Sequence, residues 1–297
     1  MKHNLKVTVI LVTFFFLAQL VGLGILFQDM KVVQAVKDTG EVVTEVSHPE
    51  TALGERPNVK NQDALLMVLI AILIGTGFIL LIAKFGVVKL WKIFFFLAVF
   101  FSITIALGTF LHFLAALIIA FLLAFFKLLK PNIAIHNITE VLIYAGIAVL
   151  FVPLFDPLWI LILLLIISAY DMFAVWKSKH MVKLAEFQIE SRAFSGLFIS
   201  PSRSKFKKSD NTKSRDAVAI IGGGDIAFPL LFAGVVLETL VLRFPPLTAF
   251  LYSLLVPVFV TIALIGLMVY GKKGHYYPAM PFLTAGALVG YGLILVL

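Results

Sequence analysis

The sequence lacks cysteine altogether and has few charged residues. The absence of cysteine excludes disulfide bonds, thiolate catalysis and Cys-based metal sites. Charged residues make up 13% of the chain and hydrophobic residues 61%, whereas about 25% of the residues in an ordinary soluble domain are charged. This composition is typical of a membrane protein. The net charge of +8 comes from basic residues between the apolar runs, which indicates loops beside anionic lipid and not nucleic-acid binding.

Nine apolar stretches are long enough, or nearly so, to cross a bilayer as helices, which takes about 20 residues. They are predicted at residues 5–27, 64–83, 93–109, 111–127, 139–155, 158–176, 217–237, 247–270 and 276–296. The predicted fold class is therefore an all-α polytopic membrane protein in which residues 1–297 form one membrane domain. The first stretch is longer than the apolar core of a signal peptide, so we interpret it as a retained helix.

The basic residues predict the orientation of the nine spans. On this count, 19 of the 24 Lys and Arg residues lie on the side of the N-terminus, ten of them in the segment 177–215. Because Lys and Arg are retained in cytoplasmic loops, we expect the N-terminus and the 177–215 loop in the cytoplasm and the C-terminus outside. Within this loop, residues 181–198 have the spacing of an interfacial helix, and the polar remainder is predicted to be partly disordered.

Two carboxylates, Asp171 and Asp225, lie well inside predicted spans. A charge inside a span costs roughly 2.5–3.5 kcal/mol to insert, so each is a functional candidate and needs a partner. At helical rise, their depths below the cytoplasmic surface differ by only about 6 Å. Because consecutive helices are usually neighbours, we expect the two carboxylates to face each other. Two such acids share one proton, so one can activate a water while the other donates to a peptide carbonyl.

Glycines and prolines mark two segments where backbone can be approached closely. Gly222, Gly223 and Gly224 remove side-chain bulk beside Asp225, so another helix, a water or a peptide can come near. Further on, the prolines of the segment 277–281 disfavour a regular first helical turn. Irregular backbone at membrane depth is tolerated where it faces a cavity, and there it can pair with an extended substrate.

Three short motifs carry a resemblance to a known family. They are Tyr170-Asp171, Gly222-Gly223-Gly224-Asp225 and Pro278-Ala279-Met280. They resemble the YD, GxGD and PAL motifs of the presenilin and signal peptide peptidase family of intramembrane aspartyl proteases, and their order and spans also agree. Each motif alone is weak, but the three together are specific. The short loops and compact length resemble a microbial member of the family.

The resemblance implies the roles of these residues. Asp171 and Asp225 would be the catalytic pair, and the remaining motif residues would shape the active site. Met280 stands where the family has Leu, a change that conserves volume. The implied partners are the bilayer and transmembrane-helix proteins, with no cofactor or metal. Presenilins keep the loop between the two aspartates cytoplasmic, so the basic loop resembles theirs and implies substrates whose N-terminus is outside.

Other interpretations stay open at this point. Asp171 and Asp225 would also suit a proton- or cation-conducting channel or secondary transporter, although we find no convincing inverted repeat between the two halves. The prepilin peptidases use a GxGD motif too, but typically with Lys two residues after the Asp, where this chain has Ala227. Gln19, inside the first span, is interpreted as an interhelical hydrogen-bonding group. A homo-oligomer is compatible with the sequence.

Overall fold

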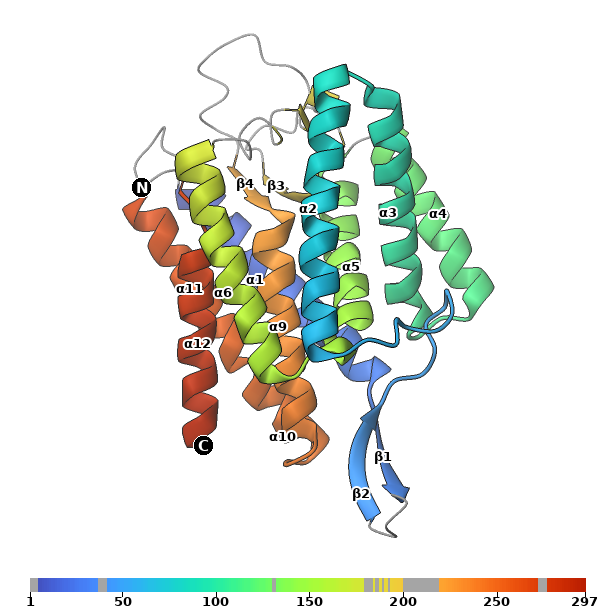
Figure 1. Ribbon diagram of the computed structural model, residues 1–297, viewed down its shortest axis with the longest axis vertical. Helices are drawn as coiled ribbons and strands as arrows, with labels where there is room; N and C mark the ends of the chain where they lie inside the picture. Colours follow the sequence, from blue (N-terminus) through green and yellow to red (C-terminus); the bar gives the residue numbers. More distant parts are fainter. Residues whose placement is uncertain are drawn as a thin grey trace.

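A computed structural model describes residues 5–36, 42–129, 132–178, 184, 187–188, 190–191, 193–199, 219–271 and 277–297. Within these residues, apolar helices run side by side between two ends of the molecule (Figure 1). They are α1 (Leu5–Asp29), α2 (Asn61–Phe85), α3 (Val88–Gly108), α4 (Phe113–Leu129), α5 (Ile133–Phe151), α6 (Pro157–Met172), α9 (Gly223–Val241), α10 (Pro246–Ser253) followed by α11 (Leu255–Tyr270), and α12 (Met280–Val296).

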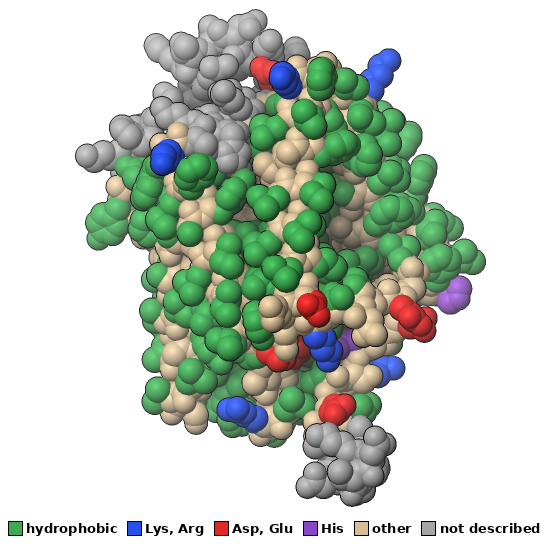
Figure 2. Space-filling view, viewed as in Figure 1, with side chains coloured by type: hydrophobic (Ala, Val, Ile, Leu, Met, Phe, Trp, Pro, Cys, Tyr) green, Lys and Arg blue, Asp and Glu red, His purple; other side chains and the backbone are tan. Residues whose placement is uncertain are grey.

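Seven helical segments of the described chain are long and apolar enough to cross a membrane, with α10 and α11 counted as one. The apolar helices α4 and α12 are shorter, at 17 residues each. Figure 2 shows hydrophobic side chains covering a broad middle band, with charged side chains towards the two ends. A surface that faces the hydrocarbon of a bilayer must be apolar, as this band is. The predicted all-α polytopic fold class is confirmed.

Helix α4 shows how the helices pack in such a fold. Its small residues Ala116, Ala120 and Ala124 recur every four positions and are buried, whereas Phe121 is 46% exposed. Small residues let helix backbones approach closely in a membrane, where burying apolar surface gives no advantage over lipid. Helix α4 therefore turns its alanine stripe to α3 and α5 and its phenylalanines outwards.

Two short sheets mark the two ends of the bundle. Strands β1 (Lys31–Val36) and β2 (Val42–Ser47) pair antiparallel and project from one end, called here the β1–β2 end (Figure 1). Strands β3 (Gly196–Ile199) and β4 (Ala219–Gly222) pair antiparallel at the opposite end, the β3–β4 end. Helix α1 begins near the β3–β4 end, and the C-terminus lies towards the other end, as an odd number of crossings requires.

The structure corrects the predicted helix at 217–237. Residues 219–222 form β4, and α9 begins only at Gly223. A short apolar run suits a strand as well as a helix, and three consecutive glycines are poor helix formers. Pairing with β3 decides in favour of the strand. The predicted interfacial helix over 181–198 is likewise wrong at its end, because β3 begins at Gly196.

Helix α5 also differs from its prediction at 139–155. It begins at Ile133, six residues earlier than predicted, because Asn132 caps it by accepting a hydrogen bond from the Ala134 amide at 3.0 Å. The polar residues of its first two turns lower the hydropathy of this stretch, yet they are buried against β3. The part of the 177–215 loop predicted to be disordered, residues 200–215, lies outside the described residues, as do positions 217 and 276 at the edges of two predicted spans.

A polar cluster fastens the β1–β2 end to the bundle. Asp29 of α1 accepts from Arg56 Nη2 at 2.7 Å and pairs with His48 Nδ1 at 2.8 Å. His48 Nε2 lies 2.7 Å from Glu238 of α9. Burial opposes protonation of His48, but hydrogen bonds and charges from Asp29 and Glu238 outweigh it and raise the pKa of His48. The segment that follows β2 thus ties the ends of α1 and α9 together.

Candidate active site

Asp171 lies near the β3–β4 end of α6, just before a π-helical turn over Phe173–Ser178 (η2). Its side chain is buried, with 9% of the residue exposed. Its Oδ2 accepts a hydrogen bond from the backbone N–H of Met280 at 3.1 Å. Tyr170 lies one residue earlier in the same helix and is partly buried.

Met280 is the first residue of α12, and the residues before it are not helical. Amides in the first turn of a helix have no hydrogen-bond partner within that helix. Asp171 accepts a hydrogen bond from one of these amides, that of Met280. Pro281 lies in this first turn, where its missing N–H costs nothing. Pro278 and Met280 are buried, and Ala279 is partly exposed. The irregular backbone predicted over 277–281 is therefore confined to residues 277–279, because Pro281 fits the first turn of α12. The end of this irregular segment faces Asp171.

Asp225 lies in the first turn of α9, directly after β4. Its carboxylate accepts from the backbone amide of Gly222, the residue that caps this helix. This contact is one half of a capping box, in which the third helical residue reaches back to the cap. The positive end of the helix dipole favours a carboxylate at this position. The strand-to-helix junction therefore determines where the carboxylate of Asp225 lies.

The two carboxylates lie on neighbouring helices. Helix α6 packs against both α9 and α12, and Asp171 and Asp225 are close enough to interact electrostatically. Each lies at a helix N-terminus, Asp171 at that of α12 and Asp225 at that of α9. Ser168 and Thr284 join α6 to α12 one turn away, with 2.7 Å between their hydroxyl oxygens. Two acids near enough to interact disfavour ionisation of both at once, so the pair favours keeping one proton.

The three glycines beside Asp225 differ in their surroundings. A Cβ atom on Gly223 would lie 2.8 Å from Ser195 Oγ and 3.2 Å from Tyr144 Oη. At Gly222 and Gly224 the nearest neighbours would be 3.4 and 3.5 Å away, close to ordinary contact. Only Gly223 is thus held tightly by its neighbours.

Comparison with known proteins identifies the family. Residues 43–297 match the family profile described as "Signal-peptide peptidase, presenilin aspartyl protease". The chain belongs to this family. Its members are intramembrane aspartyl proteases that act on transmembrane substrates, so the chain is a multi-pass membrane hydrolase. A search of curated proteins finds no match.

Two solved structures share the presenilin-family fold with this chain. Both are titled as a presenilin family intramembrane aspartate protease, one in space group C222 and one in P2. Each is 18% identical, with TM-scores of 0.58 and 0.56. The matches cover 96% and 98% of this chain and 98% and 97% of the respective structures. At this identity the likeness concerns the fold.

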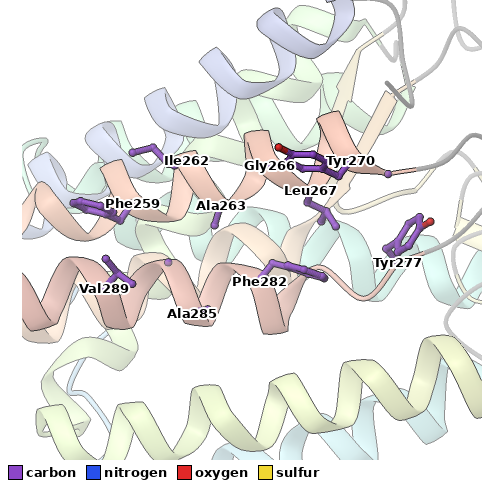
Figure 3. Close-up of a pocket in the computed structure, with 12 residues that line it drawn as sticks. Phe259, Ile262, Ala263, Gly266, Leu267, Tyr270, Tyr277, Phe282, Ala285 and Val289 are labelled. Carbon is purple, nitrogen blue, oxygen red and sulfur yellow. The ribbon is translucent and has the colours of Figure 1, made fainter.

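This presenilin-family chain has an apolar pocket of about 490 Å³ between α11 and α12 (Figure 3). Phe259 and Val289 line one end, and Tyr270 and Tyr277 line the other. Neither Asp171 nor Asp225 contributes to its lining. The pocket is therefore separate from the acid pair, although Tyr277 directly precedes the Pro278-Ala279-Met280 segment. In the described part of the chain, no three His, Asp or Glu side chains are grouped closely enough to hold a metal ion.

Gln19 of this presenilin-family chain makes the interhelical hydrogen bond that the sequence predicts. From α1, its Nε2 donates to the carbonyl of Ile226 in α9, the residue after Asp225, at 2.9 Å. Its Oε1 is buried without a hydrogen-bond partner among the described residues. Sequence reasoning missed a group of buried polar side chains on α5, whose one-face spacing along an otherwise apolar helix was the only signal available from the sequence.

Proposed function

We propose that this chain hydrolyses peptide bonds within transmembrane segments of membrane proteins, and that Asp171 and Asp225 form the dyad that activates water. The observation that carries the proposal is that α6 and α9 pack together, with Asp171 and Asp225 near enough to interact electrostatically. Membership of an aspartyl protease family gives the reaction class. The bond from the Met280 amide to Asp171 supports a site that also includes Pro278, Ala279 and Met280.

The chemistry follows from one proton shared by two acids. The ionised carboxylate removes a proton from a water, and the resulting hydroxide attacks the peptide carbonyl carbon. The protonated partner donates to the carbonyl oxygen, so that a neutral tetrahedral diol forms. Proton transfer to the amide nitrogen then breaks the C–N bond and releases an amine and a carboxylic acid. We assign the proton to the pair and not to either member.

A substrate helix must unwind locally to expose its peptide bond to the dyad. Strand β4 supports this step, because it ends at Gly222, immediately before the junction that carries Asp225. Among the described residues β4 pairs only with β3, so its other edge has no strand partner. An extended substrate segment can add to such an edge through main-chain hydrogen bonds.

The proposal includes an orientation. We place the N-terminus and the 177–215 loop in the cytoplasm and the C-terminus outside, because 19 of the 24 Lys and Arg residues then lie inside. The acid pair lies towards the β3–β4 end, so water would enter from the cytoplasm. Substrates would have their N-terminus outside. Protease accessibility of a tag at each terminus in sealed vesicles tests this orientation.

Cleavage of a transmembrane test substrate by the purified protein tests the dyad. Asp171→Asn and Asp225→Asn should each lower the rate by about 10²–10⁴-fold, the usual contribution of a general acid or base. Asp63→Asn is the matched control, since Asp63 is an exposed carboxylate in the first turn of α2. Wild-type cleavage by both dyad variants would refute the assignment. Aspartate-dependent ion flux in liposomes without cleavage would instead support the channel or transporter.

A further inference from the structure

The first half of α5 carries polar side chains that are almost completely buried. His136, Asn137, Glu140 and Tyr144 are 0–5% exposed. Their spacing places them on one side of the helix, and β3 packs against α5. We call these four residues the α5 polar face. Neither the dyad nor the known motifs explain why a membrane helix buries them.

The α5 polar face binds the backbone of β3. Asn137 makes a paired contact with Phe198, donating to its carbonyl and accepting from its amide, both at 3.0 Å. His136 Nε2 donates to the carbonyl of Gly196 at 2.8 Å. The amide of Gly196 in turn donates to Glu140 Oε2 at 2.9 Å. Four backbone groups of β3 are therefore held by three side chains.

This contact substitutes for a third strand. In an antiparallel pair, alternate residues turn their N–H and C=O groups to opposite edges. Gly196 and Phe198 face α5, so Leu197 and Ile199 face β4, where the register pairs them with Ile221 and Ala219. Two strands of four residues are not stable alone. The α5 polar face supplies the missing partner on the outer edge of β3.

Several hydrogen-bond donors surround the buried carboxylate of Glu140. Lys127 of α4 lies 2.5 Å from its Oε1. The Tyr144 hydroxyl and Ser195 Oγ donate to its Oε2, along with the Gly196 amide. A buried charge survives only when it is paired and hydrogen-bonded. Lys127 balances the negative charge of Glu140 at Oε1. Oε2 accepts from Ser195 and Gly196, where the chain enters β3.

The same cluster reaches the segment that carries Asp225. Tyr144 and Ser195, both bound to Glu140, are the neighbours that leave no room for a Cβ on Gly223. Gly223 is the first residue of α9, and Gly222, the last of β4, contacts the carboxylate of Asp225. The α5 polar face thus contacts β3 and also the junction at which β4 leads into α9.

We propose that the α5 polar face, with Lys127 as its counter-ion, positions Asp225 by holding β3, β4 and Gly223 in a fixed register against α5. These are positioning residues, because the hydrogen bonds described above go to β3, to Ser195 and to one another and not to Asp171 or Asp225, although Tyr144 lies near enough to Asp225 to interact with it electrostatically. The proposal rests on the proposed function of the acid pair. Its consequence is that loosening the α5 polar face displaces Asp225 while leaving the helix bundle folded.

Cleavage of a transmembrane test peptide by variants of the α5 polar face tests the proposal. We expect Asn137→Leu and Glu140→Gln to lower kcat by up to about 100-fold, the loss that a misplacement of about 1 Å can cause. Cleavage should also spread to neighbouring peptide bonds, because β4 no longer has one register. Thr104→Val is the matched control, since it removes a buried hydrogen bond of α3 that does not involve β3. All assays are run at a temperature where circular dichroism shows each variant folded.

A charge-balanced double variant separates positioning from mere folding. A carboxylate accepts with both oxygens, whereas an amide accepts with one end and donates with the other. In Glu140→Gln, Lys127 attracts the amide oxygen and leaves the NH₂ group facing the Gly196 amide. In Lys127→Met/Glu140→Gln, the oxygen is free to turn back to Gly196. We expect the double variant to regain a single cleavage site and most of its kcat.

The outcomes distinguish this proposal from the function on which it rests. Wild-type kcat and a single cleavage site in folded Asn137→Leu and Glu140→Gln would overturn the positioning role. An equal loss in Thr104→Val, with unchanged cleavage sites throughout, would overturn it as well. Asp171→Asn and Asp225→Asn are measured alongside. If these two still cut, the dyad assignment fails; if they are inactive while the α5 variants behave as wild type, only the positioning role fails.

Discussion

Adding one methyl group at Gly223 tests how tightly the segment before Asp225 is held. A Cβ there would lie 2.8 Å from Ser195 Oγ and 3.2 Å from Tyr144 Oη, so both side chains would have to move. Both are bound to Glu140, which resists that movement. Gly223 occupies the variable position of the GxGD pattern, so the motif itself gives no reason for a glycine there.

The expected change in the free energy of unfolding of Gly223→Ala is the sum of two opposing effects. Replacing Gly by Ala within a helix stabilises by roughly 0.5–1 kcal/mol. Overpacking a filled site costs about 1–3 kcal/mol. Gly223→Ala should therefore destabilise the protein by about 1–2 kcal/mol on balance. At Gly224, which is exposed and whose Cβ would meet Phe228 at 3.5 Å, only the favourable effect applies.

Two neighbouring variants are thus predicted to change stability in opposite directions. Denaturant unfolding in detergent micelles gives the free energy of unfolding, and cleavage of a transmembrane substrate gives activity. Gly223→Ala should lose both stability and kcat, whereas Gly224→Ala should keep or gain stability. If the two variants unfold alike, Tyr144 and Ser195 are not held in place, and the argument for a tight Gly223 site is wrong.

Three further predictions concern polar contacts elsewhere. Gln19→Leu should leave stability nearly unchanged in an unfolding assay, because loss of the bond to Ile226 (about 0.5–1.5 kcal/mol) is offset by removal of an unsatisfied buried oxygen (about 1–3 kcal/mol); a large loss would mean that this oxygen has a partner. His48→Gln should lower the free energy of unfolding most below pH 6.5, where His48 is charged in both the folded and the unfolded protein. The loss should shrink as pH rises through the raised pKa of His48 in the folded protein. A loss of stability that grows with pH would contradict this. Ser168→Ala should cost about 1–3 kcal/mol by leaving the Thr284 hydroxyl without its partner, which thermal unfolding would detect.

The sequence predicted the helical fold class because a bilayer leaves few alternatives. A segment that spans hydrocarbon must satisfy its own backbone hydrogen bonds, so each long apolar run becomes a helix. Asp171 and Asp225 stood out as candidates because an acid inside such a run is costly. The pairing of α6 with α9 could be predicted because they are successive helices joined by one loop.

The surroundings of Asp225 could not be predicted in the same way. The contacts of Asn137 with Phe198 join residues 61 positions apart, and no local pattern encodes such a pairing. His136 and Asn137 lower the hydropathy of their helix and were therefore predicted to lie outside the span at 139–155. Residues 219–222 read as the start of an apolar helix, since periodicity does not separate a short buried strand from a buried helix.

Polar contacts attach α9 to the bundle at several points along its length. Gly223 at the start of α9 is enclosed by Tyr144 and Ser195, Gln19 binds its first turn, and Glu238 near its end contacts His48. Near Asp171, Ser168 binds Thr284 and the Asp171 carboxylate binds the Met280 amide, so α6 is joined to the first turns of α12. Asp225 therefore lies on a helix that is held at several points, and Asp171 is coupled directly to the start of α12. A displacement of the start of α12 would be transmitted to Asp171 and would change the geometry of the acid pair.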